Sequence, residues 1–141
     1  MKTETENFLA ALLFTQPENE EGEIEFADKS VHDFSPAFIA AVDQFIAGFE
    51  SYLSEREIEI PEIERSFGGN VYFSLTGHGV GFWDDGETAH LQGHLEAYSG
   101  NKYRFEHIDI YEHENGELDL SVLPEYLDER RKYFFAVNVN A

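Results

Sequence analysis

Residues 35–53 read SPAFIAAVDQFIAGFESYL and mark a helix more clearly than any other part of the chain. Serine followed by proline is typical of a helix start, because the hydroxyl caps a free backbone N–H and proline suits the first turn. Apolar side chains then recur at the spacing of one helix face: Phe38, Ile39, Val42, Phe45, Ile46, Phe49 and Leu53. We therefore expect an amphipathic helix that buries this stripe.

The sequence before this helix divides into an apolar and an acidic part. Residues 7–14, NFLAALLF, are apolar nearly all round, which predicts a short helix packed into the core. Residues 17–33 predict a long acidic surface loop, with a short extended piece at 24–26. The apolar run is too short to cross a membrane and precedes no small-residue cleavage site. We therefore expect no signal peptide and a cytoplasmic protein.

Two hairpins are expected after the long helix. In residues 71–83, VYFSLTGHGVGFW, a two-residue Gly77-His78 turn would place the alternating apolar side chains on one face. In residues 104–122, a three-residue loop at 114–116 brings the apolar side chains of both strands to the same face. This second turn requires Gly116 in the left-handed conformation.

The remaining elements complete an α+β prediction. Residues 87–99 predict a helix that ends at Gly100, and Pro124 opens a short helix that ends in basic residues. Residues 133–139 predict a closing strand. We expect residues 1–141 to form a single α+β domain, with an antiparallel sheet of about five strands and two or three packed helices.

The charge of the chain narrows the class of partner. The formal net charge is −20 over 141 residues, and 29 acidic residues face nine Lys and Arg. Nucleic acid and anionic membranes are poor partners, because binding them normally needs clustered basic residues. The absence of cysteine excludes disulfides and thiolate metal sites. We expect a protein that binds a basic surface of another protein. We expect it to be a monomer or a homodimer and to carry no cofactor.

The segment LTGHGVGFWD at residues 75–84 is similar to a known group of sequences. It resembles the core of small acidic phage- and plasmid-encoded proteins, whose pattern is close to F-x-L-T-x-x-x-H-G-x-G-F-W-D. The resemblance extends over roughly residues 8–120, including the Ser-Pro helix start and the 114–116 turn, and residues 124–141 depart from it. It implies an origin on a mobile element and a cytoplasmic location in a bacterial host, and it carries over no activity.

Carboxylates form the main candidate binding site. Two runs stand out: Glu18, Glu20, Glu21, Glu23 and Glu25 in the first loop, and Glu55, Glu57, Glu59, Glu62 and Glu64 after the long helix. Asp84, Asp85 and His78 join them from the motif. The plain alternative is that these carboxylates only keep the protein soluble.

Aromatic and histidine residues give further candidates. Tyr72 and Trp83 would share the outer face of the first hairpin, either as a binding platform or, as we favour, covered by a helix. His90 and His94 lie one helical turn apart and could hold a metal with a third ligand. The Gly-rich turn at 77–81 lacks the Gly-Lys-Ser/Thr ending of a phosphate-binding loop.

These features favour an interaction protein over an enzyme. We expect an acidic protein of a mobile element that binds a basic surface of a host protein, including as a DNA mimic that inhibits a host nucleic-acid-binding or defence protein. One alternative is a small metal-binding or hydrolytic enzyme that uses His78 or His90 and His94. Another is an accessory phage protein whose acidity serves only solubility.

The high charge predicts how stability depends on salt. Screening reduces self-repulsion, so the melting temperature should rise between about 10 mM and about 300 mM NaCl, while the Debye length falls from roughly 30 Å to below 10 Å. Thermal unfolding followed by circular dichroism measures this. A melting temperature that falls steadily over this range would contradict the prediction.

Overall fold

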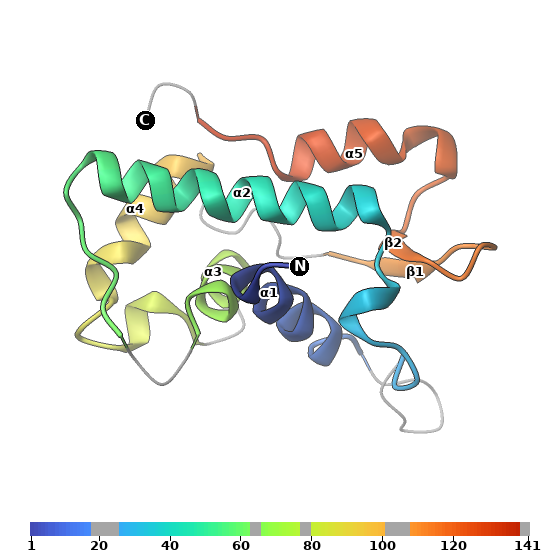
Figure 1. Ribbon diagram of the computed structural model, residues 1–141, viewed down its shortest axis with the longest axis horizontal. Coiled ribbons are helices and arrows are strands. Elements are labelled where there is room, and N and C mark those ends of the chain that lie inside the picture. Colours follow the sequence, from blue (N-terminus) through green and yellow to red (C-terminus); the bar gives the residue numbers. More distant parts are fainter. Residues whose placement is uncertain (18–25, 63–65, 77–79, 101–107, 139–141) are drawn as a thin grey trace.

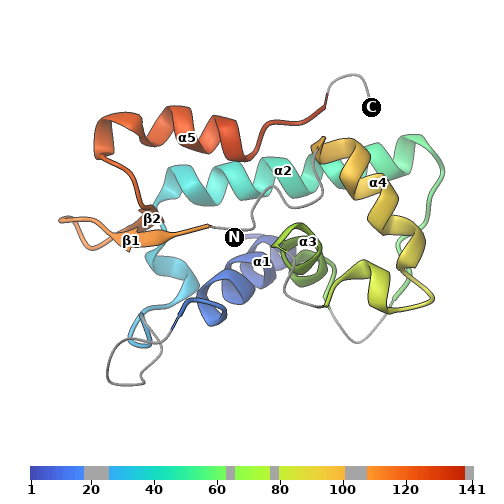
Figure 2. The same ribbon diagram turned by 180° about the vertical axis from the view of Figure 1, so that it is seen from behind.

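The computed structural model describes residues 1–17, 26–62, 66–76, 80–100 and 108–138. Within these ranges the chain forms five α-helices and one hairpin: α1 (Thr3–Phe14), α2 (Pro36–Glu55), α3 (Phe67–Thr76), α4 (Ala89–Ser99), α5 (Leu127–Phe134), β1 (Ile110–Glu112) and β2 (Leu118–Leu120). Helix α2 runs through the middle, with α5 on one side and α1 and α3 on the other (Figure 1). Helix α4 crosses one end, and the hairpin lies at the other (Figure 2).

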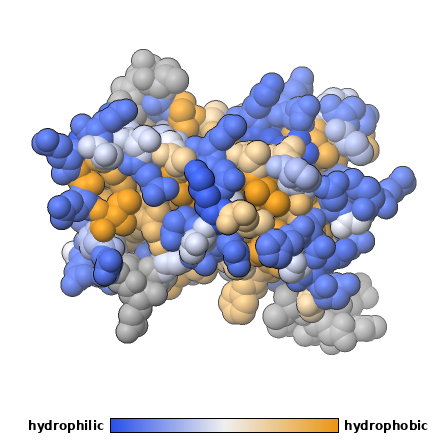
Figure 3. All heavy atoms as spheres, in the orientation of Figure 1, coloured by the Kyte–Doolittle hydropathy of each residue, from blue (hydrophilic) through white to orange (hydrophobic). Residues whose placement is uncertain are grey.

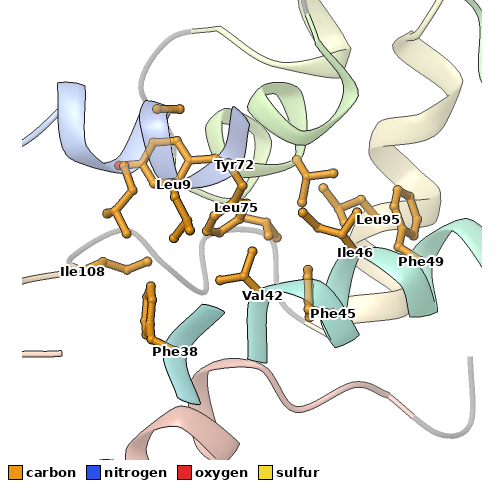
Figure 4. Packing of buried hydrophobic residues seen from close by; sticks show 14 of the residues in the cluster. Leu9, Phe38, Val42, Phe45, Ile46, Phe49, Tyr72, Leu75, Leu95 and Ile108 are labelled. Atoms are coloured by element: carbon orange, nitrogen blue, oxygen red, sulfur yellow. The ribbon is translucent and has the colours of Figure 1, made fainter. Parts of the chain in front are cut away.

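The predicted long helix is confirmed as α2. The Ser35 hydroxyl accepts a hydrogen bond from the backbone N–H of Phe38 at 3.1 Å, and Pro36 is the first helical residue. The expected stripe is buried at Phe38, Val42, Phe45, Ile46, Phe49 and Leu53. These side chains meet residues from α1, α3 and α4 in one core (Figure 4). Each fully buried Phe or Leu stabilises the fold by roughly 1.5–3 kcal/mol.

The prediction of a first hairpin is wrong, because residues 67–76 form helix α3. Val71, Tyr72 and Leu75 are buried, whereas Phe73 is only partly buried. The apolar residues of this segment fit both a period of two and a helical period, and packing against α1 selects the helix. Gly68 permits this packing, since a Cβ there would lie 1.9 Å from the backbone oxygen of Glu4. The predicted Gly77-His78 turn lies outside the described residues.

Residues 80–88 fold back onto α3 without forming a strand. The Phe82 N–H donates to the Ser74 hydroxyl at 2.8 Å, and the Thr88 hydroxyl donates to the Phe82 carbonyl at 2.9 Å. Residues Phe82–Asp84 form a 3-10 turn. Phe82 is 1% exposed, as expected for a core residue, whereas the adjacent Trp83 is 51% exposed. The turn therefore anchors one aromatic side chain and presents the other to solvent.

The second hairpin has the predicted register. Strands β1 and β2 pair Ile110 with Leu120 and Glu112 with Leu118. The N–H of His113 donates to the carbonyl of Glu117 at 2.9 Å, which closes the three-residue loop, and Gly116 has a φ of +86°. The buried faces of Ile108, Ile110, Leu118 and Leu120 join the core. The strand pairing and the hydrogen bond between His113 and Glu117 thus confirm the predicted three-residue loop.

The three shorter predicted helices are also confirmed, but the prediction of a five-stranded sheet is wrong. Helix α1 contains the predicted segment 7–14, α4 ends at Gly100 with a φ of +77°, and Pro124 begins a 3-10 turn that leads into α5. Residues 133 and 134 continue α5, and no strand follows among residues 135–138. The described chain therefore has only a two-stranded antiparallel sheet. The expected α+β architecture is replaced by a mainly helical one.

The contrast between neighbouring aromatic residues gives a stability test. Phe82→Ala should lower the free energy of unfolding by about 3–5 kcal/mol, because it leaves a cavity in the core. Trp83→Ala should change it by less than about 0.5 kcal/mol, as is usual at exposed positions. Urea unfolding of both variants measures the difference. Equal effects would contradict the placement of this turn.

Candidate functional site

The second predicted carboxylate run lies at the C-terminal end of α2 and in the segment that follows. Glu55, Glu57, Glu59 and Glu62 are all exposed. Glu64 lies outside the described residues, as do all five glutamates predicted in the first loop: Glu18, Glu20, Glu21, Glu23 and Glu25. The site can therefore be built from the 55–62 run alone.

The end of α2 turns this run outwards. The N–H of Ile58 donates to the carbonyl of Leu53 at 2.9 Å, and the N–H of Glu57 donates to the carbonyl of Ser54 at 3.0 Å. This pair of bonds is a Schellman motif, which normally has glycine at the position of Glu57. Here the residue is Glu57, which adopts the positive φ that the position requires, +56°. Ile58 packs against the core, so the glutamates on either side of it remain exposed.

The fold brings this run to the motif segment. Ile60, Glu62, Phe82 and Thr88 line one small cavity of about 390 Å³. Both segments lie at the α4 end of the molecule (Figure 1). Trp83 therefore lies at the same end of the molecule as the 55–62 carboxylate run, although about twenty residues separate the two segments. We call this surface the acidic end; its residues are Glu55, Glu57, Glu59, Ile60, Glu62, Trp83, Asp84, Asp85 and Glu87.

The predicted aromatic pair is separated. Tyr72 is 2% exposed, and its hydroxyl forms a hydrogen bond with that of Thr15. Burial raises the pKa of Tyr72. Trp83 faces solvent alone, against the favoured prediction that the pair is covered. The candidate platform is therefore a single tryptophan beside acidic side chains.

Acidic side chains continue around this end. Desolvation, and next the negative charge of Glu4, raise the pKa of the Glu50 carboxyl. Asp85 accepts a hydrogen bond from the N–H of Glu87 at 2.8 Å, which orders the segment after Trp83. The guanidinium of Arg56 lies over the ring of Tyr52 at 3.5 Å, so this nearby cation is held against an aromatic face. A cationic surface would meet mainly carboxylates here.

The histidines give no metal centre within the described residues. His90 is exposed on α4, and the ring of His94 packs edge-on to Tyr52 with centroids 6.0 Å apart. No group of three or more potential ligands occurs among the residues that the structure places. His78 lies outside them, so the alternative of an enzyme that uses this histidine stays a prediction.

A buried ion pair at the opposite end was missed by sequence reasoning. Asp119 is 1% exposed, and its carboxylate accepts from the hydroxyl of Ser35 and from the guanidinium of Arg131. In a strand whose Leu118 and Leu120 face the core, alternation alone puts Asp119 on the opposite face. Its position between two buried leucines and the run of cations in α5 were the available signals.

Comparisons with known proteins add no relative. The sequence matches no protein-family model, and no curated protein or solved structure shows significant similarity to the chain. The resemblance of residues 75–84 to phage and plasmid proteins therefore stays a prediction. Within the described ranges, the helices are too short or too polar to cross a membrane.

The unusual end of α2 predicts a stabilising substitution. A left-handed conformation costs a non-glycine residue roughly 1–2 kcal/mol, partly offset by the entropy that glycine loses on folding. Glu57→Gly should therefore raise the free energy of unfolding by about 0.5–1 kcal/mol. Glu59→Gly is the matched control, because it removes the same charge at a position without positive φ. Urea unfolding should separate the two variants, and equal stabilities would contradict the argument.

Proposed function

We propose that the chain is an acidic interaction protein whose acidic end binds a basic surface of another protein. The observation that carries this proposal is the exposed Trp83 beside carboxylates that the fold collects from two distant segments. Charge complementarity steers a partner to such a surface, and a tryptophan is among the residues that most often dominate binding energy. The carboxylates would thus select the partner, and Trp83 would anchor it.

Three local energetic costs, two within the acidic end and one at Glu50 in the same helix, support a functional origin for its charge. Glu55 lies in the last turn of α2, where the helix dipole favours cations over anions. Glu57 occupies a backbone conformation that suits glycine. Desolvation, and next the like charge of Glu4, raise the pKa of Glu50, so its charged form is disfavoured. A purely stabilising sequence would avoid all three, and strain of this kind is common at functional sites.

The partner that we propose is a protein of a bacterial host. This step rests on the resemblance of residues 75–84 to proteins of phages and plasmids. A host protein with a nucleic-acid-binding groove fits the charge, since clustered Lys and Arg line such grooves. In that form the chain would act as a DNA mimic and would compete with DNA for the groove.

Affinity capture from bacterial lysate, followed by binding measurements with the identified partner, tests the proposal. The variant E57Q/E59Q/E62Q should weaken binding by about tenfold or more at low salt, and the difference should shrink as salt screens the charges. The control variant E6Q/E125Q/E129Q removes the same charge from exposed positions elsewhere. Trp83→Ala should weaken binding at both low and high salt, because its contact is apolar.

Three outcomes distinguish the alternatives. Equal losses in the two triple variants would show that only the total charge matters, which favours the solubility alternative. Failure to retain any basic protein at low salt would reject the interaction proposal. If DNA and the chain compete for binding to the captured protein, DNA mimicry is supported. If the captured protein binds both at once, mimicry is excluded.

A further inference from the structure

A groove lies at the opposite end of the molecule from the acidic end. It is bounded by the hairpin on one side and by residues 121–131 on the other, and its volume is about 910 Å³. Binding pockets for small molecules and side chains are typically about 300–1,000 Å³. We call it the hairpin groove. In Figure 3 hydrophilic side chains cover much of the visible face of the molecule, with apolar patches between them.

Among the described residues that line the groove, the one Lys or Arg is already neutralised. The guanidinium of Arg131 donates to Asp119 from Nε at 3.1 Å and to Asp128 from Nη1 at 2.8 Å. An incoming anion would therefore find no unpaired positive charge among the described lining residues. Glu114 and Glu117 also line the groove, and neither forms an ion pair within the part of the chain that the structure places. The groove favours a cation.

Apolar side chains make up the rest of the rim. Leu123 is 61% exposed and Tyr111 is 52% exposed, which are high values for large apolar side chains that line a groove. Val122 and Leu127 are partly buried and continue the same surface. A ligand that carries only charge would leave this surface uncovered. The favoured ligand has an apolar body next to its cation.

His113 supplies an independent sign of a missing partner. It lines the groove, and its ring packs edge-on to Tyr111 with centroids 5.1 Å apart. Its Nε2 is buried and has no hydrogen-bond partner among the described residues. Buried polar atoms are nearly always paired, and each exception calls for an explanation.

We infer that the hairpin groove binds an extended peptide segment in which a lysine or arginine lies next to an apolar residue. The cation faces Glu114 and Glu117, and the apolar side chain covers Leu123 and Tyr111. An N–H of the segment donates to Nε2 of His113 once the ring turns towards the groove. This is a second docking surface and does not depend on the acidic end. The partner class follows from the charge complementarity and from the paired state of Arg131.

Fluorescence anisotropy with short labelled peptides tests this inference on the full chain. The probes are a Leu-Arg-Leu-containing peptide, the same peptide with Glu for Arg, and the same peptide with Ser for both Leu residues. Only the first should bind well, and each replacement should weaken binding by about tenfold, the effect of 1.4 kcal/mol. Leu123→Ser and E114Q/E117Q should weaken it similarly, whereas the control Glu129→Gln should not.

His113→Phe separates the hydrogen bond from packing. The substitution keeps an aromatic ring beside Tyr111 and removes the nitrogen, so it should weaken the first peptide by about two- to tenfold, in line with one hydrogen bond. NMR shifts on the wild-type chain provide a readout that needs no variant. Peptide-induced shifts at Tyr111, His113 and Leu123 support the inference, and shifts confined to the acidic end overturn it.

Two other outcomes would also overturn the inference. Equal binding of the Arg and Glu peptides would show that charge does not select the ligand. A homodimer that Leu123→Ser converts to a monomer, measured by light scattering, would show that a second copy of the chain occupies the groove. Because the acidic-end variant E57Q/E59Q/E62Q should bind the peptides normally, failure here is distinguishable from failure of the proposed function.

Discussion

The buried carboxylate of Asp119 joins three elements that are distant in sequence. It accepts from the hydroxyl of Ser35 at the start of α2, from the guanidinium of Arg131 in α5 and from the N–H of Leu120 in β2. The backbone reinforces this junction, since the N–H of Ser35 donates to the carbonyl of Leu118 at 2.9 Å. Removing one partner of a buried ion pair typically costs about 3–5 kcal/mol, because it leaves an uncompensated charge. The junction therefore fixes where α2 begins and how α5 lies along it.

This junction also shapes the electrostatics of the surface. The chain has only nine Lys and Arg, and Arg131 is committed to the interior and to Asp128. Lys29 is paired with Glu112 at 2.9 Å, and this hydrogen bond raises its pKa. Cations near the hairpin thus serve the fold, whereas the carboxylates of the acidic end stand in excess.

The sequence predicted correctly those elements whose apolar pattern is compatible with only one secondary structure. The stripe of α2 fits only a helix, and the burial of Leu118 with Leu120 allows only one hairpin loop length. Residues 71–75 fit two periods equally, and only packing against α1 decides between them. The solvent exposure of Trp83 and the burial of Asp119 depend on contacts between distant segments, so alternation along one strand could not reveal them. The carboxylates of residues 55–62 were predictable as a run, but their proximity to residues 82–88 was not.

Helix α2 separates the two proposed binding surfaces by a fixed length. Ser35, which caps its N-terminus, lines the hairpin groove, and its last turn carries Glu55 of the acidic end. Twenty helical residues span about 30 Å, at 1.5 Å per residue. A ligand in the groove therefore leaves the acidic end open. A single partner that reaches both surfaces would gain affinity from the link between them, because the second contact becomes intramolecular. The buried core along α2 keeps this separation constant, so the spacing of sites on such a partner would itself be a basis for selection.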